Sequence, residues 1–470
     1  MIRTIKLVVI LMFVNLYSFA YSGLEGKFNH IVPPDSSSSL VDRAAARLLI
    51  DEGKQLLNQG RTRDALTKFR QAYVRDKYSS RAAYWVGRAH YNLSNYGYAL
   101  QYAKVSESLS QAADGEVFYL LGQAYHRKNQ LDSARMNYDL AKIQLSKTKN
   151  SAYLIDELIA QVNYAQSVKD KEIRFQKELL PGEVISGFSD YSPVLAPNHQ
   201  ELYFVSRRPD TKGGGVNPSD QNYFEDIYIA KWNETEQIWD SVSNDLERLN
   251  TDGFDAISHI TSDGQTIYTT LNTSVLDISN TTRGSDIAIS SMTNQGRWSK
   301  PKPINHKQIN TSFFEGGATL TADENTMYFI SDRNAERSMM DIFVVHRDGK
   351  KWGEVRALPA NVNSGGNETT PYITPDGQYL FFSSDGFIGM GGYDIFVTKN
   401  LGNGEWSDPI NLGPEFNTVN NDTHFRYYEE LARAYFSSYR LQDNKASIDI
   451  YQIGLEGWEI PQPAKKKEKE

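Results

Sequence analysis

Two patterns of apolar positions divide the chain. From about residue 40 to residue 169, small and large apolar residues recur with helical periodicity. Beyond residue 170, short apolar runs alternate with turn pairs such as Asp-Gly. The first pattern is typical of packed helices and the second of short antiparallel strands. We therefore predict a multidomain α + β protein, with an α-helical domain at residues 41–169 and a β domain at residues 170–462.

The helical half repeats with a period of about 34 residues. Gly53, Gly87 and Gly122 are 34 and 35 residues apart, and an alanine follows each of them after twelve residues. Four residues further on, Phe69 and Tyr138 stand in the first and third repeats, and an alanine stands in the middle one. Small residues let paired helices approach, and large ones fill the gap between pairs. The spacing resembles that of tetratricopeptide repeats, which implies about three repeats plus a final helix that caps the stack.

The β half repeats with a period of about 55 residues. An Asp-Ile pair begins a strand at five places, with the aspartates at 226, 286, 341, 394 and 449, and a tryptophan follows each strand after a turn. The strands are apolar on both faces, so each sheet needs cover on both sides. Five units of four short strands predict a five-bladed β-propeller. We expect the aspartate to hold the entering turn and the isoleucine to fill the gap between blades.

The fourth unit, "TPYITPDGQYLFFSSDGFIGMGGYDIFVTKN", resembles the WD40-like repeats of TolB-type propellers. It pairs a proline-aspartate-glycine turn with a second strand that an aspartate leads; the other units match more loosely. Closure of the ring has two candidates. Residues 172–180 or the segment around Trp458 would supply the outermost strand of the last blade.

The first 22 residues have the pattern of a secretory signal peptide, with Arg3 and Lys6 before a short apolar run and small residues after it. An uncleaved anchor is the alternative. Removal of this segment leaves 48 basic and 58 acidic residues, a formal charge of −10. An acidic chain without a basic stripe is a poor nucleic-acid binder. Residues 23–40 are a Pro/Ser-rich linker, and residues 463–470 form a charged tail.

The sequence contains no Gly-x-Ser-x-Gly elbow, phosphate loop or His-Glu-x-x-His helix, and it has no cysteine. We therefore predict no catalytic residues, no cofactor and no metal site. Of the eight histidines, His259 and His424 are expected to face the propeller channel, without forming a metal site.

A set of five acidic residues stands out, because each precedes the innermost strand of a blade: Asp190, Asp255, Glu315, Glu368 and Asp422. Radial symmetry would place five carboxylates around one channel mouth, as a negative funnel for a cation or a basic peptide. Alternatively, each carboxylate accepts hydrogen bonds from its own turn or pairs with an arginine such as Arg207 or Arg333. A long Gly-rich insert at residues 207–225 is either a partner site or a tolerated insertion.

A signal peptide, tetratricopeptide repeats and a WD40-like propeller, in this order, resemble the PorE-like and OmpA-family envelope proteins of the Bacteroidota. The resemblance implies a non-enzymatic periplasmic scaffold, possible association with the outer membrane, and partners among type IX secretion or gliding proteins. Peptidoglycan binding is doubtful, because residues 463–470 are not an OmpA-like domain. The alternative is a ligand-binding protein or a glycan-active enzyme that uses the propeller channel, with the repeats as a docking module.

Overall fold

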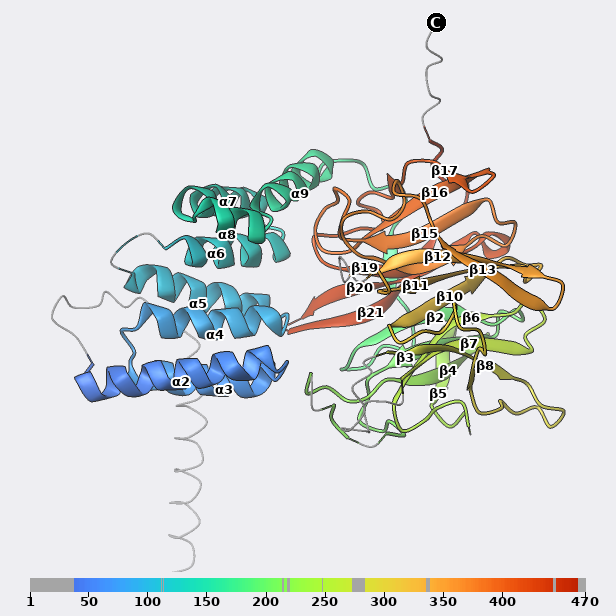
Figure 1. The fold of residues 1–470 in the computed structure, drawn as a ribbon, viewed down its shortest axis with the longest axis horizontal. Coiled ribbons are helices and arrows are strands. Elements are labelled where there is room, and N and C mark those ends of the chain that lie inside the picture. Colours follow the sequence, from blue (N-terminus) through green and yellow to red (C-terminus); the bar gives the residue numbers. More distant parts are fainter. Residues whose placement is uncertain are drawn as a thin grey trace, which may run out of the picture.

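The computed structural model describes residues 38–463, except residues 111, 113, 214, 218–219, 247, 273–283, 335–338 and 443–444. The predicted signal peptide, nearly all of the linker and tail residues 464–470 lie outside the described residues. A stack of helices precedes a five-bladed β-propeller (Figure 1), which confirms the predicted fold class. Within the described ranges, no helix combines the length and the apolar character that crossing a membrane requires.

Three helical hairpins and two further helices form the stack. The helices are α2 (Leu40–Asn58), α3 (Thr62–Arg75), α4 (Ser80–Asn92), α5 (Tyr96–Leu109), α6 (Gly115–Arg127), α7 (Leu131–Gln144), α8 (Lys147–Ala152) and α9 (Ile155–Val168). Polar caps start several of them; Ser79 Oγ, for example, accepts a hydrogen bond of 3.1 Å from the N–H of Ala82. Helix α9 packs on α7 and buries Val162 and Ala165, so it covers the end of the stack as the sequence predicts.

The repeated glycines set the distance between paired helices. A Cβ atom at Gly53 would lie 2.3 Å from the ring of Phe69, and one at Gly122 would lie 2.5 Å from the ring of Tyr138. The middle repeat has no ring at the corresponding place, and there a Cβ atom at Gly87 would meet the backbone of α5 at 3.2 Å. Gly53 and Gly122 are thus needed for close packing against a ring, whereas the space at Gly87 in the middle repeat is tight without being closed to a Cβ atom.

Each blade is an antiparallel sheet with its first strand innermost. Blade one has β2 (Asp190–Leu195), β3 (Glu201–Ser206), β4 (Asp226–Asn233) and β5 (Ile238–Ser243). Blade two has β6 (Phe254–Ile260), β7 (Thr266–Asn272), β8 (Asp286–Ser291) and β9 (Lys302–Pro303). Blade three has β10 (Glu315–Leu320), β11 (Thr326–Ser331), β12 (Asp341–Asp348) and β13 (Lys351–Ala357).

Blade four has β14 (Glu368–Ile373), β15 (Tyr379–Ser384), β16 (Asp394–Gly402), β17 (Glu405–Trp406) and β18 (Ile410–Asn411). Blade five has β19 (Asp422–Tyr428), β20 (Arg433–Gln442) and β21 (Lys445–Gly454), with the short η2 (Glu429–Leu431) between the first two. Its fourth strand is β1 (Lys177–Leu179), which pairs with β21.

The ring is therefore closed by the segment that enters the propeller, the first of the two candidates. Lys177 pairs with Ile453, and Leu179 pairs with Tyr451. Trp458 does not extend the sheet; its ring lies 5.6 Å from that of Phe416, in a cluster of residues from blades four and five. A sheet that combines both ends of the propeller ties the first and last blades together.

The isoleucines of the Asp-Ile pairs fill the gaps between blades, as predicted. All five are fully buried. Ile227 of blade one packs in one cluster with Ile257 of blade two, and Ile450 of blade five packs with Phe204 of blade one. The same relation around the ring explains why the pair recurs once per blade.

Candidate functional site

The five predicted carboxylates lie inside the turns of their own blades. Each has an exposed fraction of 0 or 1%, at the start of β2, β6, β10, β14 or β19. Glu315 is representative: it accepts hydrogen bonds from the N–H of Thr311 at 2.8 Å and from the hydroxyl of Ser331 at 2.8 Å. Arg333 Nη2 also lies 3.1 Å from its carboxylate. These contacts match the alternative in which the carboxylate accepts hydrogen bonds from its own turn and pairs with an arginine.

The other four carboxylates have the same arrangement. A serine or threonine four residues earlier donates its backbone N–H and its hydroxyl to the acid, and in four of the five blades a serine of the second strand donates as well. The acids are Asp190, Asp255, Glu315, Glu368 and Asp422. A negative funnel needs exposed carboxylates without local partners, so these buried acids do not form one.

Burial raises the pKa of several of these acids despite their hydrogen bonds. The pKa of Glu368 is raised to about 7, and that of Asp255 is also raised to about 7. In blade two, Leu271 occupies the place that a serine takes in the other blades, so Asp255 lacks that donor. The buried acids thus stabilise the turns as hydrogen-bond acceptors.

A repeated asparagine, which the sequence reasoning missed, links consecutive blades. In blades two to five it lies five residues before the acid, as Asn250, Asn310, Asn363 and Asn417. Each accepts a hydrogen bond of 2.7–2.8 Å from the N–H of the isoleucine in the previous blade's Asp-Ile pair. Each also donates to the carbonyl of that isoleucine. The signal was available in the sequence of blades two to five. There an apolar residue is followed by Asn, then by Thr or Ser, then by three variable residues and the acid. At the closing seam Ile185 replaces the asparagine, and the N–H of Leu180 donates to Ile450 there.

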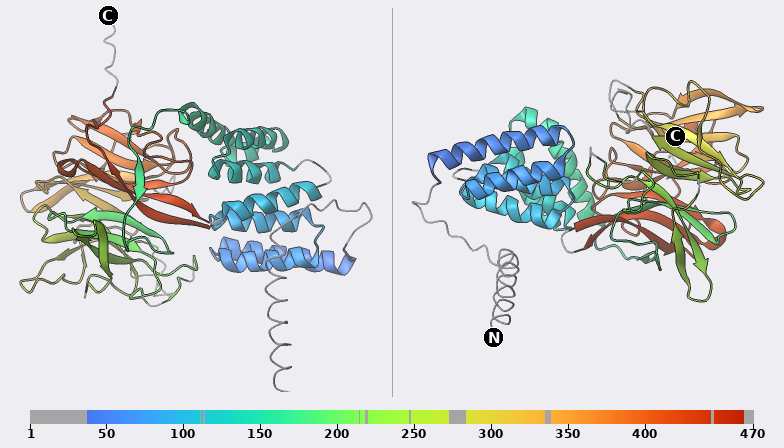
Figure 2. Two further views of the ribbon diagram at one scale, coloured as in Figure 1. Left: turned by 180° about the vertical axis from the view of Figure 1, so that it is seen from behind. Right: turned by 90° about the horizontal axis from the view of Figure 1, so that it is seen from below.

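The helical stack docks on the propeller through its third repeat. A ring nitrogen of His126 lies 2.8 Å from the carbonyl oxygen of Met390, and Arg127 Nη1 donates to the carbonyl of Val419 at 2.7 Å. Met390 and Val419 are buried in the same cluster as the core of α7 and α9. Burial lowers the pKa of His126 to about 4, with a smaller effect from Arg127, so the ring is neutral near pH 7. Figure 2 shows the stack beside one face of the propeller.

The long insert of blade one contacts the same stack. Arg63 of α3 donates from its backbone N–H to Gln221 Oε1 at 2.7 Å and from Nη2 to Asn222 Oδ1 at 2.6 Å. Of the two interpretations of the insert, these bonds favour a contact role, and the partner here is the chain's own helical domain.

The central channel contains two cavities, one toward each face of the propeller. The larger has a volume of about 880 Å³ and the smaller about 390 Å³. Both are lined by Ser258 and Arg426, so these residues separate them. The larger cavity is bounded by the turns that follow the innermost strands, at Pro197, Pro375 and Glu429. The stack contacts the opposite ends of the strands, so this cavity lies on the far face.

The predicted channel histidines line the two cavities, His259 the larger and His424 the smaller. Burial lowers the pKa of each ring to about 3, and the positive charge of Arg426 adds to the effect. Both rings are therefore neutral at physiological pH. In the ranges that the structure describes, no group of three or more His, Asp or Glu residues is arranged to hold a metal ion.

A cation–aromatic strip crosses the first helices of the three repeats. It consists of Lys54 on α2, Arg81, Trp85, Arg88 and Tyr91 on α4, and Tyr119 on α6. Lys54 Nζ lies 5.3 Å from the centre of the Trp85 ring, and Arg81 Cζ lies 5.4 Å from it. Arg88 Cζ lies 5.9 Å from the ring of Tyr119 on the next helix. Arginine, tryptophan and tyrosine are the residue types that most often dominate protein interfaces.

Comparison with known proteins supplies no family. No family model and no curated protein matches the chain. Among solved structures, the first TPR domain of human RPAP3 is 16% identical and matches 26% of this chain and 97% of its own, with a TM-score of 0.23. The α-L-arabinofuranosidase PaAbf62A from Podospora anserina is 12% identical and matches 59% of this chain and 95% of its own, with a TM-score of 0.36. The family 117 glycoside hydrolase Zg3597 from Zobellia galactanivorans is 13% identical and matches 61% of this chain and 91% of its own, with a TM-score of 0.33. No activity is transferred from them.

Proposed function

We propose that this protein is a non-enzymatic scaffold that binds partner proteins through its helical stack and through the propeller. The observation that carries the proposal is the cation–aromatic strip. Its rings and cations lie on three neighbouring helices, and such stacks present this surface to a partner segment. Lys54 and Arg81 already form ion pairs with Asp51 and Glu116. Arg88 instead donates to the neutral Gln123, so it favours a partner segment with an acidic side chain at that place.

The contacts between the stack and the propeller support a scaffold role. Met390 and Val419 are buried against the third repeat, and Arg63 holds the blade-one insert. Two modules with a shared core keep their binding surfaces at a fixed separation and orientation. A scaffold that positions one partner relative to another requires this property.

The cellular setting is a further part of the proposal and rests on the sequence. The signal-peptide pattern and the domain order, which resembles that of PorE-like and OmpA-family envelope proteins, favour the periplasm. We propose partners in the type IX secretion or gliding machinery on the same ground. Cell fractionation with protease protection tests the location. We expect the protein to resist added protease in intact cells and to be digested once the outer membrane is opened. Recovery of the protein in the cytoplasmic fraction would reject the periplasmic location.

Charge reversal in the strip tests the binding surface. We expect Arg81→Glu with Arg88→Glu to abolish crosslinking of partners from envelope extracts to the stack, because both the charge and the cation–ring contacts are lost. The matched control is Arg135→Glu on α7, an arginine outside the strip that also forms a surface ion pair, with Asp139. The proposal would be contradicted if the double variant captured partners as well as the Arg135→Glu control does, or if the wild-type protein captured none specifically.

Ligand binding in the propeller channel is a second candidate function. The cavity of about 880 Å³ favours it, since this volume falls in the range of small-molecule sites. Among the described residues, Ser258 and Arg426 line both cavities, and both residues are polar. The nature of a ligand for this cavity follows from its charges.

A further inference from the structure

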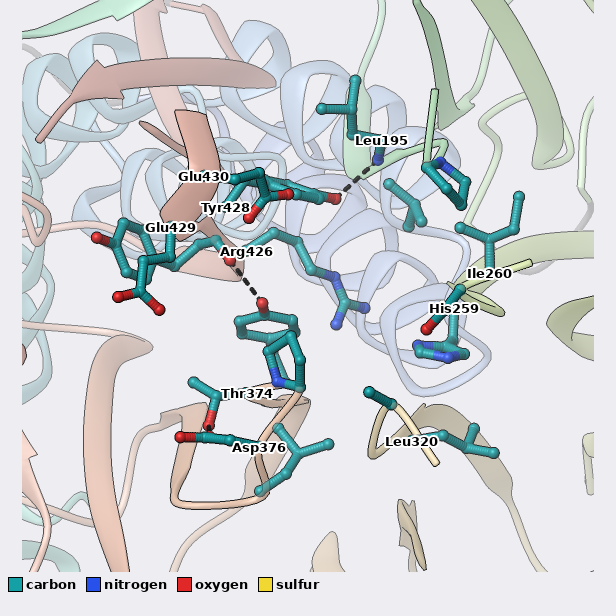
Figure 3. Close-up of a pocket in the computed structure, with 18 of the residues that line it drawn as sticks. Leu195, His259, Ile260, Leu320, Thr374, Asp376, Arg426, Tyr428, Glu429 and Glu430 are labelled. Carbon is teal, nitrogen blue, oxygen red and sulfur yellow. Dashed lines mark hydrogen bonds between the residues drawn. The ribbon is translucent and has the colours of Figure 1, made fainter. Parts of the chain in front are cut away.

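Arg426 lies at the floor of the larger channel cavity with most of its charge uncompensated. It extends from β19, and its exposed fraction is 6%. Nη2 donates to the carbonyl of Ser258 at 2.5 Å, and Nη1 donates to the carbonyl of Pro371 at 3.5 Å. Nε has no hydrogen-bond partner. Figure 3 shows the guanidinium group pointing into the open centre of the cavity.

No carboxylate within ion-pair distance balances this charge in the part of the chain that the structure describes. Arg333 and Arg440, by contrast, each lie 3.1 Å or less from a buried carboxylate. Buried arginines are ordinarily paired, because an isolated charge in a region of low dielectric is costly. Arg426 therefore offers an unused N–H donor and a positive charge to an anion that enters the cavity.

The neighbours of Arg426 restrict the kind of anion. His259 is neutral at physiological pH, and the hydroxyl of Tyr372 is engaged by the carbonyl of Tyr427 at 2.5 Å. Glu429 and Glu430 stand exposed at the mouth. One planar guanidinium matches one planar carboxylate. A phosphate dianion would need more cations than this cavity provides, and an acidic mouth disfavours a ligand with several negative charges.

The cavity walls restrict the rest of the ligand. Leu195, Ile260, Leu320 and Ile373 line the space around the guanidinium group. The ring of Tyr372 lies 5.2 Å from Arg426 Cζ and supports the group from one side. Apolar walls around a buried cation, with Asp376, Glu429 and Glu430 also in the lining, favour a ligand whose carboxylate points inward to Arg426 and whose body is apolar.

We propose that the larger channel cavity binds a monocarboxylate with an apolar body, and that Arg426 holds the carboxylate. This site lies on the propeller face opposite the helical stack, so it is separate from the proposed scaffold surface. Two kinds of molecule carry such a carboxylate: the C-terminal end of a polypeptide chain, and a free organic acid.

Affinity selection on the full chain tests the proposal and distinguishes the two kinds of molecule. One arm uses random hexapeptides with free C-terminal carboxylates against the same pool as C-terminal amides. A second arm measures thermal shifts with butyrate, benzoate and phenylacetate at low salt. We expect at least tenfold enrichment of free acids over amides, or a saturable shift with an aromatic acid, and loss of either in Arg426→Met.

Two further variants keep the test sharp if Arg426→Met unfolds. Arg426→Lys retains the charge but loses the planar fork, and it should weaken binding by at least fivefold. Ile260→Glu adds a carboxylate to the wall of the cavity that Arg426 also lines, and it should abolish binding by repelling an anionic ligand. Equal binding by Arg426→Met, equal retention of acids and amides, or no binding in both arms would overturn the proposal.

Discussion

Asn363 holds both polar backbone groups of Ile342 in the preceding blade. Its Oδ1 accepts a hydrogen bond of 2.8 Å from the N–H of Ile342, and its Nδ2 donates to the carbonyl of Ile342 at 3.0 Å. Nδ2 also donates to the carbonyl of Leu358 at 3.1 Å. One side chain thus supplies a partner for the N–H of Ile342, which lies just beyond the last residue pair of β12 and β13, Phe343 with Ala357. The same contact recurs in three other blades.

Replacement of this asparagine should destabilise the propeller. We expect Asn363→Ala to lower the free energy of unfolding by ~1–3 kcal/mol, because the buried N–H of Ile342 loses its partner, while its carbonyl keeps the hydrogen bond from the N–H of Leu358. Chemical denaturation followed by tryptophan fluorescence measures the loss. Asn325→Ala is the control, since the side chain of Asn325 donates to Asp323 in an exposed turn. A loss no larger than that of the control would show that the contact is dispensable.

The glycine of the third repeat gives a second prediction. We expect Gly122→Leu to destabilise the helical stack by ~1–3 kcal/mol through overpacking. A Cβ atom there would lie 2.5 Å from the ring of Tyr138, which is itself buried. Far-UV circular dichroism during thermal unfolding is the measurement. Gly187→Ala serves as a control, because a Cβ atom at Gly187 has no neighbour within 4 Å. Unchanged melting of Gly122→Leu would mean that the repeat register is incorrect.

The raised pKa of Glu368 gives a pH prediction. Its pKa rises from 4.5 to about 7 on folding, so the folded state holds the proton more tightly than the unfolded state. The stabilising contribution is fully present below about pH 4.5 and is lost as pH rises through 7. Glu368→Gln imitates the protonated form, so relative to wild type it should gain ~1–3 kcal/mol between pH 5 and pH 8.

Denaturant unfolding at several pH values measures this change. Glu354→Gln is the control, because Glu354 is exposed on β13 and should leave the pH profile of wild type unaltered. A Glu368→Gln profile parallel to that of wild type would show that Glu368 does not titrate in this range. Glutamine retains one of the two acceptor oxygens, and its Nε2 donates, so a serine hydroxyl of the turn must accept at the other position.

The interface between the modules gives a fourth prediction. The segment between α9 and β1, residues 169–176, joins the two modules, and the sequence places the domain boundary near residues 166–175. We expect limited proteolysis to cut this segment and leave two stable fragments. Because Arg127 donates to Val419, Arg127→Ala should speed the cut several-fold by loosening the docked stack.

Arg135→Ala provides the reference rate, since Arg135 lies on α7 and contacts Asp139 and Asn163 within the stack. If both variants are cut at the wild-type rate, the contact of Arg127 does not restrain the modules. Cuts scattered through either half without a resistant core would instead contradict the division into two domains.

The repeat periods determined the architecture before any contact was known. The 34-residue spacing of Gly53, Gly87 and Gly122 specifies helical pairs because a residue without a Cβ atom packs closely against a ring or a backbone. The Asp-Ile spacing specifies blades because each isoleucine must be buried between two sheets. Such constraints act within a repeat or between neighbouring repeats, so they are written in the sequence as a period.

Only the tertiary structure decided what the conspicuous polar residues do. Asp190 and its four counterparts have the spacing of a ring of charges, but serine and threonine donors of the same blade enclose them. Arg426 carries no repeated signal, because it occupies one place in the channel where carbonyls of blades two and four converge on blade five. The docking of Arg127 on Val419 likewise joins residues 292 positions apart. Contacts of this kind depend on how blades and domains pack together, and a local sequence pattern does not predict this packing.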